Sequence, residues 1–184
     1  MPRTDPWFDQ LYRQYHRQVF AYCLRRTEPV DADDAVAEVF TVAWRRRDDI
    51  PRGDRALPWL YGVARNVLRH QGRSTSRFRR LTSRVAGMQQ TPPLGPEQVV
   101  VEAEEYVRVK RAVAQLSSGD QDVLLLAAWE GLSHAEIATA LNCSTDAVDK
   151  RLQRAKQRLR KQFESLPKFQ TQRPPVNTAK GEGP

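Results

Sequence analysis

The sequence predicts an all-α protein made of two small helical domains joined by a flexible linker, with a helix-turn-helix in the second domain. Apolar residues recur at helical spacing almost throughout the chain, and no alternating strand pattern of convincing length appears. A segment rich in proline and glutamine over residues 86–98 separates the two helical regions. In the second region, two helix-start signals stand close together with only a tight turn between them.

The composition and charge of the chain limit the functions that it can have. A net charge of +8 and a pI near 9.9 indicate a polyanionic partner. No apolar run approaches the roughly 20 residues of a membrane span, and the N-terminus lacks the apolar core of a signal peptide. Cys23 and Cys143 have no CxxC or Cys/His spacing, so metal and disulfide sites are disfavoured and a reduced, cytoplasmic environment fits best. Since the sequence shows no catalytic triad, metal cluster or phosphate loop, we expect no enzyme activity and no cofactor.

Local signals predict the first two helices. Asp5 followed by Pro6 is a favourable helix start, and this helix is expected to end near Arg26. Residues 27–30 are interpreted as a turn, after which Asp31 begins a second helix. Acidic side chains in the first turn of that helix and arginines at its end both suit the helix macrodipole.

A third helix follows a loop over residues 48–55 and is predicted to open at Pro58. Residues 65–80 then contain six arginines and no acidic residue. Helical spacing gives this helix one core face and one polar face. The core face consists of Leu60, Val63, Ala64 and Val67, and the polar face of Asn66, Arg69, His70 and Arg73.

The second domain is predicted to begin with a helix over residues 99–116. Ser118 and Gln121 then form a capping box before a further helix over residues 123–129, which Gly131 ends.

The helix-turn-helix is predicted from three caps. Ser133 and Glu136 form a capping box, Asn142 tolerates the left-handed geometry of a helix end, and Ser144 can cap the last helix. Several basic residues of this last helix lie off its apolar stripe, as in a helix that enters a DNA major groove. An ordinary helical hairpin with a solvated basic face is the alternative. The very short turn, the small Ala138 where the helices must cross and the basic second helix together favour DNA binding.

These motifs resemble those of bacterial RNA polymerase sigma factors of the compact extracytoplasmic-function (ECF) type, within the sigma-70-like family. The resemblance covers about residues 8–163 and is carried by residues 31–44, 59–66 and 124–159. A helix-turn-helix alone is moderately specific, whereas the three motifs in this order are highly specific. The resemblance implies region 2 over residues 5–85 and region 4 over 99–165, with the linker over 86–98 between them. The polar composition of the tail over residues 166–184, rich in proline and glycine, predicts disorder.

The resemblance assigns residues 31–44 to docking on the clamp helices of the polymerase β′ subunit. Acidic residues near a helix start are also favourable without any partner, so the residues alone leave both interpretations open. Ala37 departs from the glutamine that many relatives carry. The implied polymerase-binding residues are Asp33, Asp34, Glu38, Thr41 and Arg45.

The resemblance assigns residues 59–80 to opening and reading the −10 promoter element, with the loop at residues 50–55 capturing a flipped base. Arginines suit phosphates, and aromatic rings suit unstacked bases. Trp59 and Tyr61 could stack on bases or lie in the core, and the core is favoured for Trp59. The implied −10 contacts are Arg52, Asp54, Arg65, Asn66, Arg69, His70 and Arg73.

The helix that starts at Ser144 would read the −35 element. Residues near the N-terminus of such a helix usually reach bases, and later basic residues meet phosphates. Asp146 and Asp149 could accept hydrogen bonds from cytosine or point away as caps, and the second is favoured. Ser144, at the helix start, is among the implied −35 contacts. The implied base contacts are Thr145, Asp146, Asp149, Lys150 and Arg151, and the implied backbone contacts are Arg154, Lys156 and Arg158.

The resemblance also implies the partners. These are core RNA polymerase (through the β′ clamp helices and the β subunit), promoter DNA and an anti-sigma factor, without a stable homo-oligomer. The expected location is the cytoplasm, at the nucleoid or held at the membrane by an anti-sigma factor. Two rival functions are a free-standing helix-turn-helix regulator and a non-specific nucleic-acid or structural protein. Neither rival requires the motif at residues 31–44.

Overall fold

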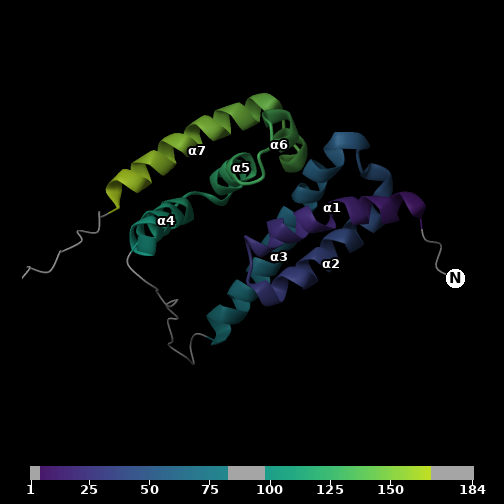
Figure 1. Cartoon of the computed structure of the whole chain (residues 1–184), viewed down its shortest axis with the longest axis horizontal. Coiled ribbons are helices and arrows are strands. Elements are labelled where there is room, and N and C mark those ends of the chain that lie inside the picture. Colours follow the sequence, from purple (N-terminus) through teal and green to yellow (C-terminus); the bar gives the residue numbers. More distant parts are fainter. Residues whose placement is uncertain (1–4, 83–97, 167–184) are drawn as a thin grey trace, which may run out of the picture.

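The computed structural model describes residues 5–82 and 98–166, with side chains for residues 5–72 and 106–166. The described part contains helices and no strand, which confirms the all-α prediction. Figure 1 shows a first helical group, α1–α3, beside a second helical group, α4–α7. The elements are α1 (Pro6–Leu24), α2 (Pro29–Arg45), the 3-10 turns η1 (Arg47–Asp49) and η2 (Gly53–Arg55), α3 (Ala56–Thr82), α4 (Gln98–Ala114), α5 (Ser118–Ala128), α6 (His134–Leu141) and α7 (Thr145–Ser165).

The first helical group contains the three helices that the sequence predicts. Asp5 caps α1 by accepting a hydrogen bond from the backbone N–H of Trp7 at 3.1 Å. Each helix then turns its apolar stripe toward the other two, because helices of this length are stable mainly through a packed apolar face. The predicted core face of α3 is buried in full, at Leu60, Val63, Ala64 and Val67.

Two predicted helix starts are wrong by two residues. The second helix begins at Pro29 rather than Asp31, because proline fits the first helical position and leaves the preceding Glu28 extended. The third helix begins at Ala56 rather than Pro58. Pro58 lies in the first turn of α3, where a backbone N–H has no partner within the helix, so its missing donor costs little.

The predicted capping box of α5 is displaced by one residue. Ser117, and not Ser118, is the N-cap, and its hydroxyl accepts a hydrogen bond from the backbone N–H of Asp120 at 3.2 Å. The side-chain amide of Gln121 donates to the carbonyl oxygen of Leu116 at 2.9 Å. Ser118 is therefore the first helical residue, and its hydroxyl is free to meet another element.

The helix-turn-helix forms as predicted. The backbone N–H of Ser133 donates to the carboxylate of Glu136 at 2.8 Å, and the N–H of Glu136 donates back to the Ser133 hydroxyl at 3.3 Å. Asn142 ends α6 in the left-handed region with φ 50°. Ser144 caps α7 by accepting from the N–H of Ala147 at 3.2 Å. These caps fix the tight turn between α6 and α7.

Loss of the capping box should destabilise the helix-turn-helix. In the Ser133→Ala variant, α6 loses its N-cap acceptor, and we expect the free energy of unfolding to fall by about 1 kcal/mol. Urea denaturation followed by circular dichroism measures the change. Ser165→Ala, at the exposed C-terminal end of α7, is the matched control and should change stability far less. Equal losses in both variants would contradict the role of the cap.

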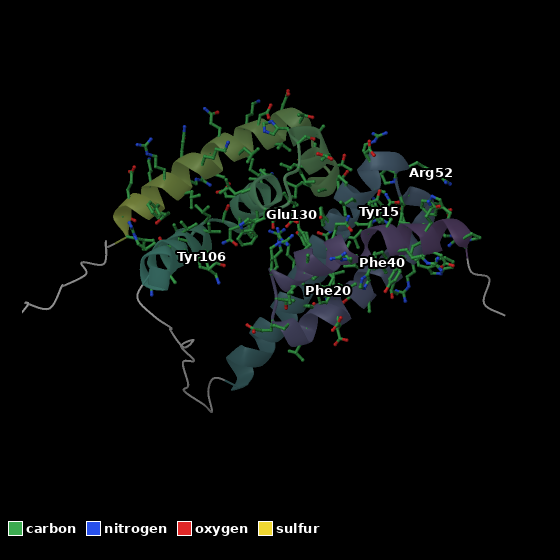
Figure 2. The ribbon with its side chains drawn as sticks, in the orientation of Figure 1. Tyr15, Phe20, Phe40, Arg52, Tyr106 and Glu130 are labelled. Carbon is green, nitrogen blue, oxygen red and sulfur yellow. The ribbon has the colours of Figure 1, made fainter. Side chains whose placement is uncertain are left out.

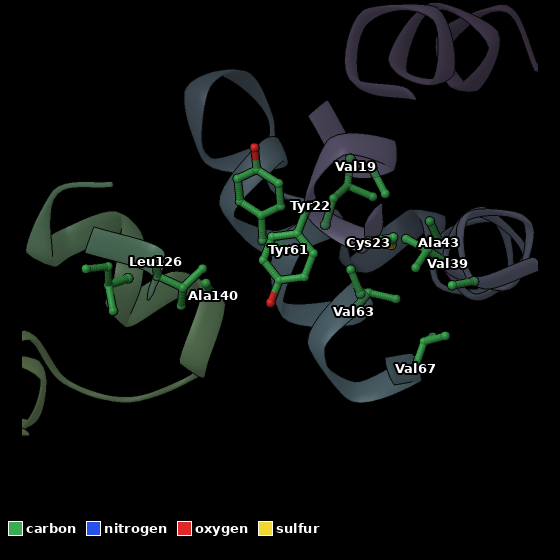
Figure 3. Packing of buried hydrophobic residues seen from close by; sticks show 14 of the residues in the cluster. Val19, Tyr22, Cys23, Val39, Ala43, Tyr61, Val63, Val67, Leu126 and Ala140 are labelled. Atoms are coloured by element: carbon green, nitrogen blue, oxygen red, sulfur yellow. The ribbon is translucent and has the colours of Figure 1, made fainter. Parts of the chain in front are cut away.

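The two helical groups pack against each other through α3 and α6. The rings of Tyr22 and Tyr61 stack with their centroids 4.9 Å apart, and Tyr61 is buried. Figure 3 shows these rings on the side of the first group that faces Leu126 and Ala140. Tyr61, rather than the half-buried Trp59, is therefore the more deeply buried aromatic residue of this motif.

The predicted linker over residues 86–98 lies outside the described residues except for Gln98, which begins α4. The predicted disordered tail lies outside them from residue 167 onward. In the described ranges, no helix is both long enough and apolar enough to span a membrane.

Candidate nucleic-acid and polymerase interfaces

The outer face of α2 carries the residues that the family resemblance assigns to polymerase docking. Its buried stripe packs on α1 and α3, so the polar positions between those residues point outward. Thr41 donates to the carbonyl oxygen of Ala37 at 2.8 Å, and Glu38 accepts from the side-chain amide of Gln71 at 3.0 Å. All of the residues assigned to polymerase docking are exposed, namely Asp33, Asp34, Glu38, Thr41 and Arg45.

Aromatic side chains hold α2 on α1. The ring of Phe8 meets that of Trp44 edge-on, with centroids 5.0 Å apart, and the ring of Tyr12 meets that of Phe40 with centroids 4.6 Å apart. Such pairs fix both the distance and the rotation of two helices. The polar face of α2 is therefore held rigidly on the outside of the first helical group.

The loop before α3 forms an open pocket of about 180 Å³ with the N-terminal half of α1. The guanidinium of Arg52 lies over the ring of Trp7, 4.7 Å from its centroid. Both predicted loop contacts, Arg52 and Asp54, line this pocket, and Figure 2 shows Arg52 and Tyr15 among its side chains. The α1 side of the pocket was not predicted from the sequence. It consists of Trp7, Gln10, Leu11, Gln14 and Tyr15.

Two of the predicted −10 contacts on α3 pair with the second helical group, and two others are exposed. Arg65 donates from Nε to the carboxylate of Asp122 at 2.6 Å. Arg69 donates to the Ser118 hydroxyl at 2.5 Å and lies 3.4 Å from the same Asp122 carboxylate. Asn66 and His70 are exposed. The side chain of Arg73, also predicted to touch DNA, lies outside the described residues.

The last helix, α7 (Figure 1), carries the predicted −35 contacts, most of them on its exposed surface. Val148, Leu152 and Ala155 bury the opposite stripe against α5 and α6. Arg151 is half-buried. The exposed residues of this predicted set are Ser144, Thr145, Asp146, Asp149, Lys150, Arg154, Lys156 and Arg158.

Two of these α7 residues are engaged by neighbouring helices. Asp149 forms an ion-pair contact with the imidazole Nδ1 of His134 on α6. Arg158 donates to the carboxylate of Asp120 on α5 at 2.5 Å. Both contacts brace α7 against the helices that support it. Among the predicted contacts on α7, Lys150, Arg154 and Lys156 remain as exposed cations that could meet a partner.

Two carboxylates in the second group have shifted pKa values. Burial raises the pKa of Asp120, but the hydrogen bonds from Arg158 and Ser117 outweigh burial, so the pKa lies below its ordinary 3.8. Hydrogen bonds from the side chain and backbone of Ser133 hold the pKa of Glu136 below 4.5. Both groups favour the folded state when ionised.

These shifts predict how stability depends on pH. A carboxylate with a lowered pKa stabilises the fold above its unfolded-state pKa, and that stability is lost as the pH falls through the folded-state value. We therefore expect the melting temperature to fall between about pH 5 and pH 3, and less steeply in the Asp120→Asn variant. Thermal melts across this range test the expectation, with Asp48→Asn as the control. The same pH slope for Asp120→Asn and the native chain would contradict it.

Comparison with known proteins identifies the family. Residues 11–78 match the model of Sigma-70 region 2, and residues 106–159 match that of Sigma-70, region 4. The RNA polymerase sigma factor CnrH of Cupriavidus metallidurans is 31% identical over 140 residues, which cover 70% of this chain and 71% of that protein. The ECF RNA polymerase sigma factor SigL of Mycobacterium tuberculosis is 32% identical over 160 residues, covering 85% and 88% respectively.

Two solved structures share the fold. One is the sigma factor RpoE of Bartonella quintana in complex with the anti-sigma factor NepR, with a TM-score of 0.60, 21% identity and coverage of 86% of this chain and 97% of that one. The other is CnrH in complex with the cytosolic domain of CnrY, with a TM-score of 0.55, 25% identity and coverage of 88% and 90%. Together with the helix-turn-helix and the two matched regions, these relatives show that the chain belongs to the sigma-70 family, as an ECF-type sigma factor.

Proposed function

We propose that this chain binds core RNA polymerase and directs it to promoters by recognising −10 and −35 elements. The observation that carries the proposal is that region 2 and region 4 match in this order on one chain. A free-standing regulator would need the helix-turn-helix but not the first region. Catalysis of RNA synthesis would belong to the polymerase.

The exposed surfaces of the two helical groups would bind different partners. The exposed face of α2, centred on Asp34 and Glu38, would dock on the β′ clamp helices. The N-terminal half of α7 would enter the major groove, where its first residues reach base edges and its later cations meet phosphates. Residues 5–85 and 99–165 would act as the polymerase and −10 module and the −35 module, respectively.

The pocket between α1 and the loop before α3 would take an unstacked base of the opened −10 element. Stacking on an aromatic side chain such as Trp7 is worth about 1–3 kcal/mol per base. The guanidinium of Arg52 and the carboxylate of Asp54 add a hydrogen-bond donor and an acceptor at the same rim. This combination suits the polar edge and the flat face of a nucleobase.

An anti-sigma factor is the proposed regulatory partner. Two structures with this fold are complexes of a sigma factor with an anti-sigma factor or with the cytosolic domain of CnrY. A partner of this kind would hold the chain away from polymerase until a signal releases it. If the partner is anchored in a membrane, it would also place the chain there.

Co-elution with core polymerase on a sizing column tests the first half of the proposal. We expect the chain to move into the high-mass fraction with core and to add promoter-fragment binding that neither component shows alone. A sequence-specific footprint from the free chain, together with failure to co-elute with core, would favour the free-standing regulator instead.

A further inference from the structure

The outer side of α7 carries a glutamine that belongs to none of the predicted contacts. Gln153 is exposed and follows the buried Leu152. Val148, Leu152 and Ala155 turn the opposite side of the helix toward α5 and α6. Because residues three apart share a helix face, Gln153 stands in line with Lys150 on the side that faces away from these two helices. Figure 2 shows side chains that project from this outer side of α7.

Two of the predicted contacts on α7 are held at the edges of this outer side. Asp149 is paired with His134 on α6, and Arg158 donates to Asp120 on α5. By contrast, in the part of the chain whose side chains are described, the Gln153 side chain makes no hydrogen bond, ion pair or ring contact. Its amide oxygen and its two N–H groups therefore remain available to a partner.

The position of Gln153 along α7 also suits a contact with a base. The helix begins at Thr145 and rises about 1.5 Å per residue, so Gln153 lies about 12 Å from its start. The major groove is about 12 Å wide, and a recognition helix reaches base edges with its N-terminal residues. Gln157 is exposed one turn later, about 18 Å from the start, and lies beyond this reach. Gln153 is therefore within reach of base edges, whereas Gln157 is not.

The carboxamide of a glutamine matches one base in the major groove. It offers a hydrogen-bond donor and an acceptor side by side. Adenine presents the N7 acceptor and the N6 amine donor there, so a glutamine can form two hydrogen bonds with it. Each of the other three bases presents only donors or only acceptors in this groove. Adenine is therefore the base that satisfies both groups of the carboxamide.

We infer that Gln153 reads an adenine of the −35 element and selects this base through paired hydrogen bonds to N6 and N7. This inference rests on the proposed function, which brings α7 to the −35 element. It adds a residue that determines base specificity to the contacts that the family resemblance implies. A paired contact of this kind favours the right base over a wrong one by between about fivefold and about 150-fold.

Three substitutions test the role of the carboxamide. Gln153→Ala removes both hydrogen-bonding groups and adds no charge. Gln153→Glu keeps the size of the side chain but replaces the amide donor by a carboxylate, which accepts from the N4 amine of cytosine. Gln157→Glu is the matched control, because it makes the same change one turn further along α7. Both positions are exposed, so each variant should keep its helices, which circular dichroism checks.

The measurement is selection from a double-stranded DNA library with a randomised segment, followed by sequencing of the bound fraction. The full chain is tested both alone and bound to core polymerase. We expect the native chain to enrich a motif in which one −35 position prefers adenine by at least about fivefold. Gln153→Ala should remove the preference at that position alone, and Gln153→Glu should replace adenine by cytosine there. Gln157→Glu should leave the preference at every position unchanged.

Three outcomes would overturn the inference. An unchanged adenine preference in both Gln153 variants would show that this side chain reads no base. The same change of preference in Gln157→Glu would show that added charge, and not the position of Gln153, sets the preference. A library from which the native chain enriches no motif, alone or with core polymerase, would show that α7 reads no base sequence.

The two forms of the experiment separate this inference from the proposed function. A motif that the free chain enriches and that both Gln153 variants change as expected, together with no binding to core polymerase, would reject the proposed function and leave the assignment of Gln153 standing. A motif that the chain enriches only with core polymerase, and that neither Gln153 variant changes, would support the proposed function and reject the assignment.

Discussion

Replacing Lys150 and Arg154 together by glutamate is expected to abolish promoter-dependent transcription while leaving binding to core polymerase unchanged. Both side chains are exposed on the N-terminal half of α7, and Arg154 also donates to the backbone carbonyl of Lys150 at 3.2 Å. Loss of one contact with DNA costs about 1–3 kcal/mol, so two losses weaken promoter binding by at least about 30-fold. Repulsion between glutamate and phosphate weakens it further.

The measurement is transcription in vitro with reconstituted polymerase, alongside a core-binding assay. Lys110→Glu combined with Lys161→Glu is the matched control, since it changes the net charge equally at exposed positions away from the start of α7. We expect the control to keep most of its activity. If both pairs reduced transcription equally, overall charge rather than the groove-facing part of α7 would explain DNA binding.

The second large effect concerns the core of the first helical group. Leu60 is fully buried in α3, where that helix packs on α1 and α2. Truncation to alanine removes apolar contacts and leaves a cavity, which costs about 2–5 kcal/mol. In the Leu60→Ala variant we therefore expect the first group to unfold at much lower urea concentration, and core binding through α2 to be lost under conditions where the native chain still binds.

Leu24→Ala provides the comparison, because Leu24 is 42% exposed at the end of α1. The Leu24→Ala variant should therefore unfold at nearly the same urea concentration as the native chain. Trp7, Trp44 and Trp59 lie in the first group and Trp129 in the second, so fluorescence can distinguish the unfolding of the two groups. Equal unfolding midpoints for Leu60→Ala and Leu24→Ala would contradict the burial on which the account of the core depends.

Local hydrogen-bonding motifs explain why the helix-turn-helix could be predicted from the sequence. Ser133, Asn142 and Ser144 each satisfy backbone groups within three or four residues, so the sequence contains the whole interaction. The start of α5 was harder because two serines are adjacent. Ser118 with Gln121 matches the capping-box spacing, yet Ser117 is the cap, and the sequence pattern does not distinguish the two.

Contacts across the two groups could not be predicted from the sequence. Periodicity correctly predicted the core face of α3, because burial repeats along a single helix. The pairing of Arg65 with Asp122 spans 57 residues, and that of Arg26 with Glu130 spans 104. No local spacing indicates such pairs. For the same reason Trp7 was missed as a partner of Arg52, since only the fold brings the start of α1 to that loop.

Run-off transcription on genomic fragments from the host, with purified core polymerase in the presence and absence of this chain, tests the central claim most directly. We predict new transcripts that start at defined positions only when the chain is present, and upstream sequences that align at −10 and −35. Core polymerase that binds the chain and yet starts at the same positions with and without it, on every host fragment, would contradict the claim that this chain directs promoter choice.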